Sequence, residues 1–310
     1  MKSFDHNTAN IIQALFRARW RTLHRHTALG LMVLIISSCG ETDQPDATNV
    51  SDLPVPPSYP ITRTSDHQDT YFGQTIQDPY RWLEDDQSNE TATWVIDQNQ
   101  VTQRYLSQIS YREPIQKALT ELWQYPRISA PFKEGEWVYF YQNTGLQNHA
   151  VLMRQKPDQA PEVFLDANTL SDNGTISIGQ VAFSKSAQLS AYSQSKAGSD
   201  WRSIHILDTA TKQALEPPLQ NVKFSGITWL GDTGFYYSSY QKPDGSALTA
   251  QVDDHRLYFH RLGTSQLDDE LIYGGPKDEK RRYVSADLTE DQRYLSNQTA
   301  QTTAGNTLFI

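Results

Sequence analysis

The sequence has almost no cysteine: Cys39 is the single one among 310 residues, so no disulfide can form within the chain. It also lacks an excess of basic residues, since 27 lysines and arginines stand against 36 aspartates and glutamates, for a formal net charge of −9. Because nucleic-acid binding needs a basic surface, this balance argues against nucleic acid as a partner. The length allows one large domain or two ordinary ones.

Motifs for cofactors and metals are missing as well. There is no glycine-rich phosphate loop, and no histidine or cysteine pair has the spacing of a metal site. We therefore expect neither a cofactor nor a metal. Four histidines, namely His149, His205, His255 and His260, lie in turns or on strand patterns, and we interpret them as surface or core residues.

The N-terminus has the pattern of an export signal. Several arginines between positions 17 and 25 precede an apolar run at 28–36, which is too short to span a bilayer, and Ser37, Ser38 and Cys39 follow. This ending resembles the bacterial lipobox, in which the cysteine carries lipid. An uncleaved signal anchor or a chance match to the pattern is the alternative. We predict a signal peptide over residues 1–39, and a lipidated, exported protein on the periplasmic side of a membrane. Gly40 favours the outer membrane.

The next residues divide into a tether and a short helical segment. Residues 40–60 are rich in proline and polar residues, which predicts a tether. Within 61–126, the pattern predicts a helix over 89–109, capped by Ser88 or Asn89. A second helix is expected from Glu113-Pro114 to a stop near Pro126. Its apolar face predicts packing onto a neighbour; the residues of this face are Ile115, Ala118, Leu119 and Leu122.

From residue 127 to 310 the apolar period changes to that of strands. An apolar residue, a polar turn and an aromatic strand recur four times, and the successive starts differ by 51, 46 and 59 residues. The four starting residues are Phe132, Phe183, Trp229 and Leu288. A degenerate repeat near fifty residues with several strands per unit is typical of a β-propeller. An ordinary β-sandwich with chance spacing is the alternative.

Several short stretches, in order, are specific to one family. They are residues 78–85 (DPYRWLED), 143–148 (NTGLQN), 164–166, 170–175, 198–201 (GSDW), 222–229 (VKFSGITW), 257–260 (LYFH) and 262–264. Each stretch alone is a moderately specific signal, but together they resemble the N-terminal part of prolyl oligopeptidases over about residues 57–310. The resemblance implies a mainly β fold: a partial seven-bladed β-propeller with about four blades, preceded by a helical segment that packs on an α/β-hydrolase domain. That hydrolase domain is expected to be absent from this chain.

The chemistry of such a peptidase requires a serine on a G-x-S-x-G turn, with an aspartate and a histidine. The sequence contains no G-x-S-x-G, and Ser199 in the run AGSDW lacks the second glycine. We therefore predict that the 310-residue chain alone does not hydrolyse peptides and holds no catalytic residue.

Two residues are candidates for substrate contact through the resemblance. Phe224 corresponds to an aromatic that the family's propeller contributes to the substrate pocket, and Tyr283 matches a neighbouring apolar contributor less securely. A flat ring suits the rigid apolar ring of proline. The alternative for Phe224 is an aromatic in the core between blades. By the resemblance, an arginine that family members place further on is either replaced here by Ala300 or lost where the match is weak.

The resemblance implies a full-length serine endopeptidase that cleaves short peptides after proline. The expected partners are proline-containing peptides, the hydrolase domain and, through the lipid, a membrane. One alternative is a non-catalytic, membrane-tethered propeller that binds peptide or protein. Another is a related oligopeptidase of different specificity, because the pocket that decides specificity lies outside this chain.

Overall fold

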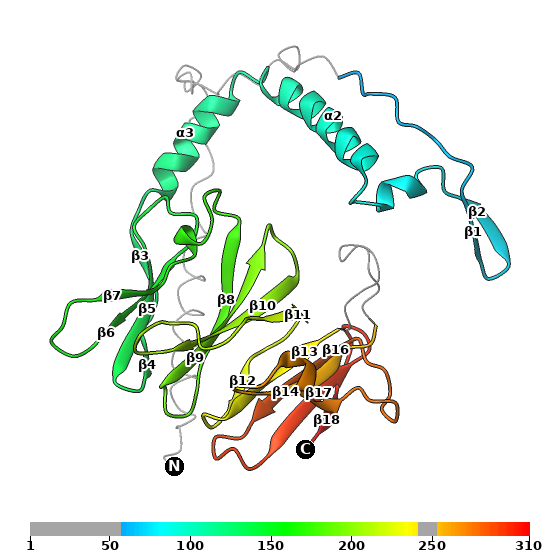
Figure 1. Cartoon of the computed structure of the whole chain (residues 1–310). Coiled ribbons are helices and arrows are strands. Elements are labelled where there is room, and N and C mark those ends of the chain that lie inside the picture. The colour runs from blue at the N-terminus through cyan, green and yellow to red at the C-terminus, as the bar shows by residue number, and fades with distance from the viewer. Residues whose placement is uncertain (1–56, 241–252) are drawn as a thin grey trace, which may run out of the picture. The chain divides into compact units, whose positions relative to one another are not determined.

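The structure is a computed structural model that describes residues 57–240 and 253–310. The predicted signal peptide, the lipidated Cys39 and most of the tether lie outside the described residues. The described part is mainly β, with two α-helices near its start (Figure 1).

The segment before the sheets begins with a hairpin that the sequence pattern did not predict. Strands β1 (Gln68–Tyr71) and β2 (Gln74–Gln77) pair through a two-residue turn, Phe72-Gly73. Both turn residues have positive φ, 51° and 80°, as a type I′ turn requires. A short 3-10 helix, η2 (Arg81–Glu84), follows.

The two predicted helices are confirmed. Helix α2 (Asn89–Leu106) begins where expected, because the Ser88 hydroxyl accepts a hydrogen bond from the Thr91 amide. It ends three residues earlier than predicted. Helix α3 (Arg112–Trp123) begins one residue before the predicted Glu113-Pro114 start.

Each of the four predicted repeats forms an antiparallel hairpin. The pairs are β4 (Phe132–Glu134) with β5 (Trp137–Asn143), β8 (Ile176–Phe183) with β9 (Leu189–Lys196), β12 (Thr228–Leu230) with β13 (Gly234–Ser239), and β16 (Tyr283–Leu288) with β17 (Leu295–Ala300). The spacing near fifty residues thus reflects four successive structural units.

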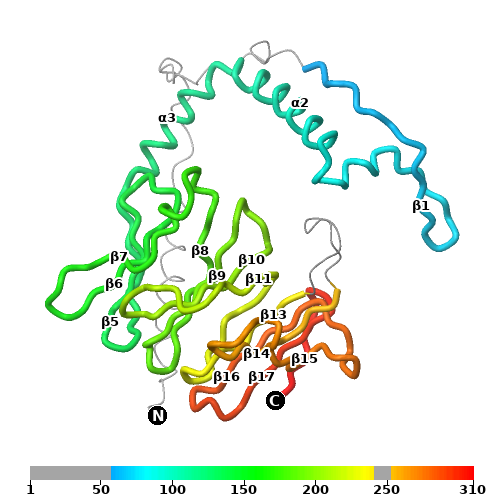
Figure 2. The backbone as a smooth tube through the Cα atoms, viewed as in Figure 1, coloured from blue at the N-terminus to red at the C-terminus, as the bar shows by residue number. Residues whose placement is uncertain are grey.

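Further strands extend each hairpin into a meander. They are β3 (Arg127–Ile128), β6 (Val151–Gln155) and β7 (Glu162–Leu165) in the first unit, β10 (Trp201–Asp208) and β11 (Leu219–Lys223) in the second, β14 (Arg256–Arg261) and β15 (Glu270–Tyr273) in the third, and β18 (Thr307–Phe309) in the fourth. Figure 2 shows the backbone passing through these units in chain order, from green to red. The architecture is that of a partial propeller.

The second and third units are joined more closely than separate blades would be. They form one eight-stranded sheet in the order β15-β14-β13-β11-β10-β9-β8, with β12 beside β13. Strand β11 makes the link, since it pairs with β10 on one side and with β13 on the other. Its pairing with β13 consists of a single register pair, Val222 with Ser239. Sequence spacing alone did not indicate this junction.

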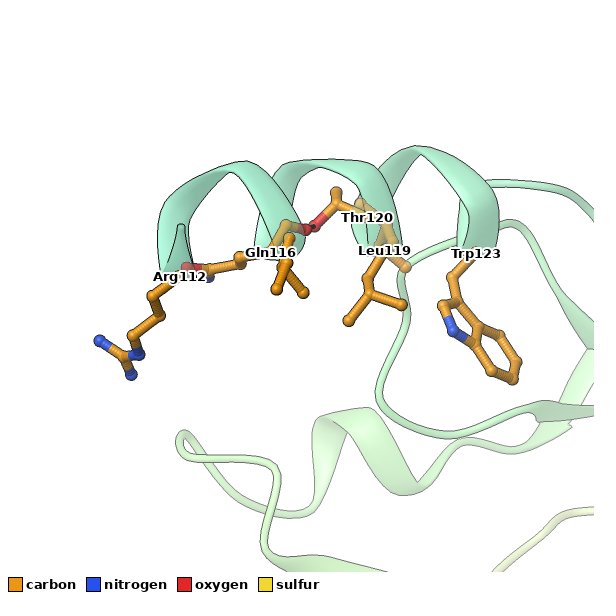
Figure 3. A pocket seen from close by; sticks show the side chains of 7 residues that line it. Arg112, Gln116, Leu119, Thr120 and Trp123 are labelled. Atoms are coloured by element: carbon orange, nitrogen blue, oxygen red, sulfur yellow. Dashed lines mark hydrogen bonds between the residues drawn. The ribbon is translucent and has the colours of Figure 1, made fainter. Parts of the chain in front are cut away.

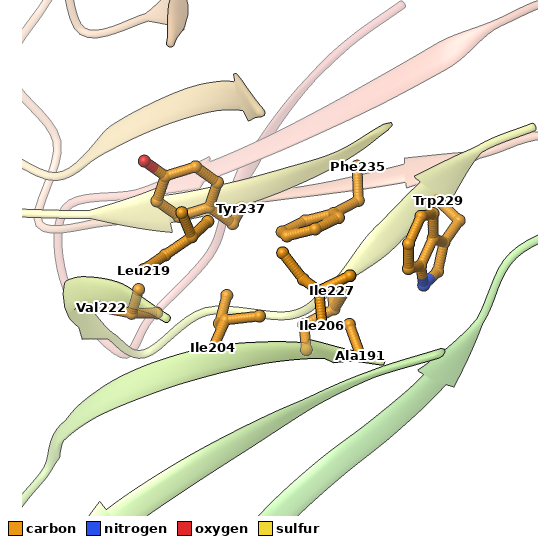
Figure 4. Close-up of a cluster of buried hydrophobic side chains, with 9 residues drawn as sticks. All are labelled: Ala191, Ile204, Ile206, Leu219, Val222, Ile227, Trp229, Phe235 and Tyr237. Carbon is orange, nitrogen blue, oxygen red and sulfur yellow. The ribbon is translucent and has the colours of Figure 1, made fainter. Parts of the chain in front are cut away.

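The main core lies between these two units, in the cluster shown in Figure 4. Its buried members are Ala191, Ile204, Ile206, Leu219, Val222, Ile227, Trp229, Phe235 and Tyr237. The Trp229 indole N–H also donates to the Ala182 carbonyl at 3.2 Å, so the ring is satisfied as well as buried. A smaller cluster joins the first unit to the second, where Phe183 packs 4.7 Å from Tyr139, measured between ring centroids.

The polar turns of successive hairpins are hydrogen-bonded to one another. The Lys185 amide donates to the Gly231 carbonyl at 3.1 Å, and the Ser186 hydroxyl donates to Asp232 at 2.9 Å. The Gly231 amide in turn donates to the Gln292 side chain at 2.8 Å. Because these turns occupy equivalent positions in their units, the same edge of three consecutive units is connected.

Candidate functional site

Phe224 and Tyr283, the two candidates for substrate contact, lie together. Phe224 directly follows β11 and Tyr283 begins β16, and their ring centroids are 5.8 Å apart at an interplanar angle of 59°. Phe224 is 45% exposed, so it is not a fully buried core aromatic. Its backbone has φ 54°, in the left-handed region that a bulky residue rarely adopts.

A third aromatic residue, Tyr240, completes the group, and sequence reasoning missed it. Its ring lies 6.5 Å from Phe224, nearly perpendicular at 86°, and it is only 5% exposed. We call Phe224, Tyr240 and Tyr283 the aromatic wall. Burial, followed by the nearby Tyr283, raises the pKa of Tyr240 to about 12. Its hydroxyl therefore stays protonated at neutral pH and donates to the Arg282 carbonyl.

A cation and an indole border the aromatic wall. The Lys223 ammonium lies 5.1 Å from the Phe224 ring centroid and 5.2 Å from that of Trp201, which is close enough for cation–π attraction. Trp201 in turn packs 6.3 Å from Tyr240, edge to face. Trp201 belongs to the GSDW run that carried the family resemblance, so a signal for it was present. Nothing in the sequence pattern pointed to Tyr240.

Ala300, the position that the family resemblance relates to an arginine of other members, is also close to the aromatic wall. Ala300 is the register partner of Tyr283 in the β16–β17 pair. A side chain that replaced the methyl group there would stand beside Tyr283. The alanine leaves that position without a charged group.

His255 is completely buried and lies beneath the aromatic wall. Its ring stacks on Tyr240 with 4.3 Å between centroids and 20° between planes. One ring nitrogen, Nε2, is 2.9 Å from the Lys223 carbonyl, and the other, Nδ1, accepts from the Val284 amide at 2.8 Å. Burial lowers the pKa of His255 to about 4, so the ring is neutral at physiological pH.

A second buried polar cluster, around His260, joins the second and third units. His260 Nδ1 lies 2.7 Å from Asp269, and its Nε2 lies 2.6 Å from Glu216. The Tyr237 hydroxyl donates to the other Asp269 oxygen at 2.7 Å. Burial disfavours the charged form of His260, but the two carboxylates outweigh it and raise the pKa of His260 above its usual value. Each of these groups has a hydrogen-bond partner within the cluster, so we interpret the cluster as a structural clamp between the two units.

Ser199, His149 and His205 have local structural partners. Ser199 lies in the β9–β10 turn, where its hydroxyl accepts from the Trp201 amide at 3.1 Å. His149 bonds to the Gly174 carbonyl at 3.1 Å. His205 stacks on Tyr192 with 4.9 Å between centroids, and burial lowers the pKa of His205. Within residues 57–240 and 253–310, no three His, Cys, Asp or Glu side chains gather as a metal site would need.

The apolar face of α3 is uncovered among the described residues. Ile115, Leu119 and Leu122 are 51%, 50% and 72% exposed, although the sequence pattern predicted that this face packs. Leu119 and Trp123 project from the same side of the helix and border a shallow pocket (Figure 3) that Leu146 also lines. None of the helices in the described part is long and apolar enough to cross a membrane.

Comparison with known proteins agrees with this description. A family model described as the N-terminal beta-propeller domain of prolyl oligopeptidase matches residues 59–310. The four-unit fold therefore defines a propeller of the peptidase-associated class. The chain belongs to the prolyl oligopeptidase family, as its N-terminal, propeller portion.

The relatives are considerably longer than this chain. The prolyl endopeptidase of Elizabethkingia miricola is 53% identical over 253 residues, which are 81% of this chain and 36% of that protein. Prolyl oligopeptidase A of Amanita bisporigera is 35% identical, over 82% of this chain and 38% of that protein. The chain thus spans little more than a third of the length of these curated relatives.

Solved structures of relatives have the same fold. One, from a structural and mechanistic analysis of two prolyl endopeptidases, matches with a TM-score of 0.69 at 26% identity, over 81% of this chain and 37% of that one. Prolyl oligopeptidase B of Galerina marginata, bound to a 35mer hydrolysis and macrocyclization substrate, matches with a TM-score of 0.67 at 28% identity. That match covers 82% of this chain and 39% of the Galerina protein.

Proposed function

We propose that this chain is the propeller portion of an exported serine peptidase that cleaves short peptides after proline, and that the aromatic wall contacts the peptide. The observation that carries the proposal is the meeting of Phe224 and Tyr283, 5.8 Å apart and partly exposed, in a member of this family. A half-exposed ring against a second ring offers flat apolar area to a proline side chain.

A binding titration tests the role of the aromatic wall. A capped glycyl-prolyl peptide amide is titrated into the 310-residue chain while intrinsic fluorescence is recorded. We expect saturable binding that weakens about tenfold in Phe224→Ala, because an apolar aromatic contact of about 1.4 kcal/mol is lost. The matched peptide with alanine in place of proline is the control. Equal binding of the two peptides would contradict a proline-directed wall.

The proposal also includes a partner for the α3 face. We propose that the hydrolase domain of the full-length enzyme covers Ile115, Leu119 and Leu122, whose exposure in this chain supports a missing neighbour. Co-expression with the hydrolase domain of the Elizabethkingia miricola relative tests this. We expect a co-purifying complex with peptidase activity, whereas the chain alone stays inactive against a proline-containing fluorogenic peptide. Peptidase activity of the chain alone would refute the proposal that the catalytic residues belong to the hydrolase domain.

A propeller that binds peptide without belonging to an enzyme is the second candidate. The partly exposed rings of Phe224 and Tyr283 favour it equally, because binding needs only the rings. The two proposals differ in the co-expression result: peptide binding with neither complex nor activity would favour the binding protein.

Export as a lipoprotein is proposed from the lipobox-like ending at Cys39. Labelled palmitate should enter the wild-type chain in a Gram-negative host and should not enter Cys39→Ser. Fractionation should place the labelled chain in the outer membrane. Labelling of the serine variant would exclude Cys39 as the lipidated residue.

A further inference from the structure

We infer that His255 is a positioning residue that sets the separation of Phe224 and Tyr283, an inference that rests on the proposed peptide-binding role of the aromatic wall. His255 touches neither the exposed side of the wall nor solvent. It is bonded to the backbone beside each of the two rings. Nε2 reaches the carbonyl of Lys223, the residue before Phe224, and Nδ1 reaches the amide of Val284, the residue after Tyr283.

The two backbone partners dictate one tautomer. An amide N–H can only donate, so Nδ1 of His255 must be the unprotonated acceptor for Val284. A carbonyl can only accept, so Nε2 must carry the proton that is donated to Lys223. The neutral ring with its proton on Nε2 satisfies both groups at once. The lowered pKa of His255, about 4, is consistent with that neutral form.

The hydrogen bond from His255 to the Lys223 carbonyl lies next to a strained backbone position. Phe224 has φ 54°, a conformation that costs a bulky side chain energy and persists only when the surroundings hold it. The carbonyl bonded to His255 is that of the peptide unit leading into Phe224. The aromatic wall therefore depends on a backbone conformation that is fixed from beneath.

His255 also anchors the strand that carries Tyr283 at a second point. Its own backbone amide donates to the Arg281 carbonyl at 2.8 Å, while Nδ1 holds Val284 on the other side of Tyr283. The ring stacks on Tyr240, whose hydroxyl reaches the Arg282 carbonyl between these two points. One buried ring thus connects all three members of the aromatic wall.

Three substitutions separate this role from simple packing. His255→Phe keeps a flat ring against Tyr240 but removes both hydrogen bonds. His255→Asn places an oxygen near the Nδ1 position and retains the acceptor for Val284. His255→Gln places an amide near the Nε2 position and retains the donor for Lys223.

The experiment is NMR on the full 310-residue chain with ring-labelled phenylalanine and tyrosine. In the wild type we expect a nuclear Overhauser effect between the rings of Phe224 and Tyr283. In His255→Phe it should be lost, and the affinity for the capped glycyl-prolyl peptide amide should fall about tenfold, since an untethered contact group is worth less. The affinities of His255→Asn and His255→Gln should lie between those of the wild type and His255→Phe, because each variant keeps one of the two hydrogen bonds.

A matched control comes from His205→Phe, which also replaces a histidine stacked on a tyrosine, but on Tyr192, which is not a member of the aromatic wall. It should leave the ring contact and the peptide affinity unchanged. An intact ring contact and an affinity within twofold of wild type in His255→Phe would overturn the inference.

The outcomes remain separable from the proposed function. If the wild-type chain does not bind the peptide, the role of the aromatic wall fails, but the ring contact still decides what His255 does. If His255→Phe does not fold, nitrogen NMR of histidine in the wild type decides. We expect a neutral ring protonated at Nε2; a proton on Nδ1 or a charged ring at neutral pH would overturn the inference.

Discussion

The junction of the second and third units and the helical segment before the sheets show opposite outcomes of the same kind of sequence pattern. Both have regular apolar faces. At the junction, Leu219 is 2% exposed in a core shared by five strands, β9 to β13. On α3, Leu122 is 72% exposed. Apolar periodicity therefore identifies which side of an element seeks a partner, but it does not identify the partner.

The polar groups of the two regions differ in the same way. The carboxylates around His260 and the backbone carbonyls around Arg154 have buried hydrogen-bond partners, and Glu216 and those carbonyls receive theirs from a neighbouring unit. In the helical segment, Arg63 and Glu90 form an ion pair at 2.5 Å in which both side chains are about half exposed. Buried polar groups are costly to leave unpaired, whereas exposed pairs contribute little. The following substitutions test that contrast.

The largest effect is expected from His260→Leu. The side chain of Asp269 is 1% exposed and would lose its hydrogen bond from His260 in an apolar setting, keeping the one from the Tyr237 hydroxyl. We expect the free energy of unfolding to fall by about 3–5 kcal/mol, measured by urea unfolding at pH 6. Glu216→Gln is the control, because its amide oxygen can still accept from His260, and it should cost clearly less. Equal costs would contradict a clamp centred on Asp269.

The same cluster predicts a dependence on pH. Because the pKa of His260 is raised in the folded chain, its contribution is fully present below the unfolded value and is lost as pH rises through the folded one. The wild type should therefore lose stability, relative to His260→Leu, as pH rises above about 6.5. Unfolding curves of both proteins from pH 5 to 9 measure this difference. A difference that stays constant would show that His260 does not titrate in that range.

A pair of leucine truncations tests the apolar part of the comparison. Leu219→Ala removes buried methyl groups from the core of Figure 4 and should cost about 2–4 kcal/mol in unfolding free energy. Leu122→Ala, on the exposed face of α3, should change stability by no more than about 0.5 kcal/mol. Similar costs at the two positions would mean that the α3 face is covered within this chain.

A smaller effect is expected from the two cations over Trp137. Arg154 is 3% exposed and donates to the carbonyls of Thr209 and Ala210, which join the first unit to the second. Arg154→Met should cost about 2–3 kcal/mol, because those carbonyls lose their donors. Lys156 lies over the same ring at 4.9 Å but pairs with an exposed Glu136. Lys156→Met should cost under about 1 kcal/mol, and a reversed order would contradict the contrast.

Much of the fold could be predicted from local patterns. The hairpins whose first strands contain Phe132, Phe183, Trp229 and Leu288 were predicted because an apolar residue, a polar turn and an aromatic strand follow a local rule. The start of α2 was predicted from the Ser88 cap, which needs only residues a few positions apart. The β1–β2 hairpin was missed because Phe72 is an unusual residue for a left-handed turn position.

The site could be predicted only in part. The resemblance led to Phe224 and Tyr283, which the fold brings together from positions 59 residues apart. Tyr240 and His255 were not predicted as neighbours of these rings. Tyr240 follows β13 and His255 precedes β14, and neither position has a local sequence feature that indicates such a contact. His255 was interpreted as a surface or core residue, and it is indeed buried.

By itself the sequence determined the order of units, the turns that separate them, the two helices and the family. These depend on contacts between residues close along the chain, where propensity and periodicity act directly. The tertiary structure alone decided that β11 joins two units through Val222, that the face of α3 meets no described neighbour, and that His255 lies beneath the aromatic wall. These depend on contacts between distant segments, whose energies no local pattern encodes.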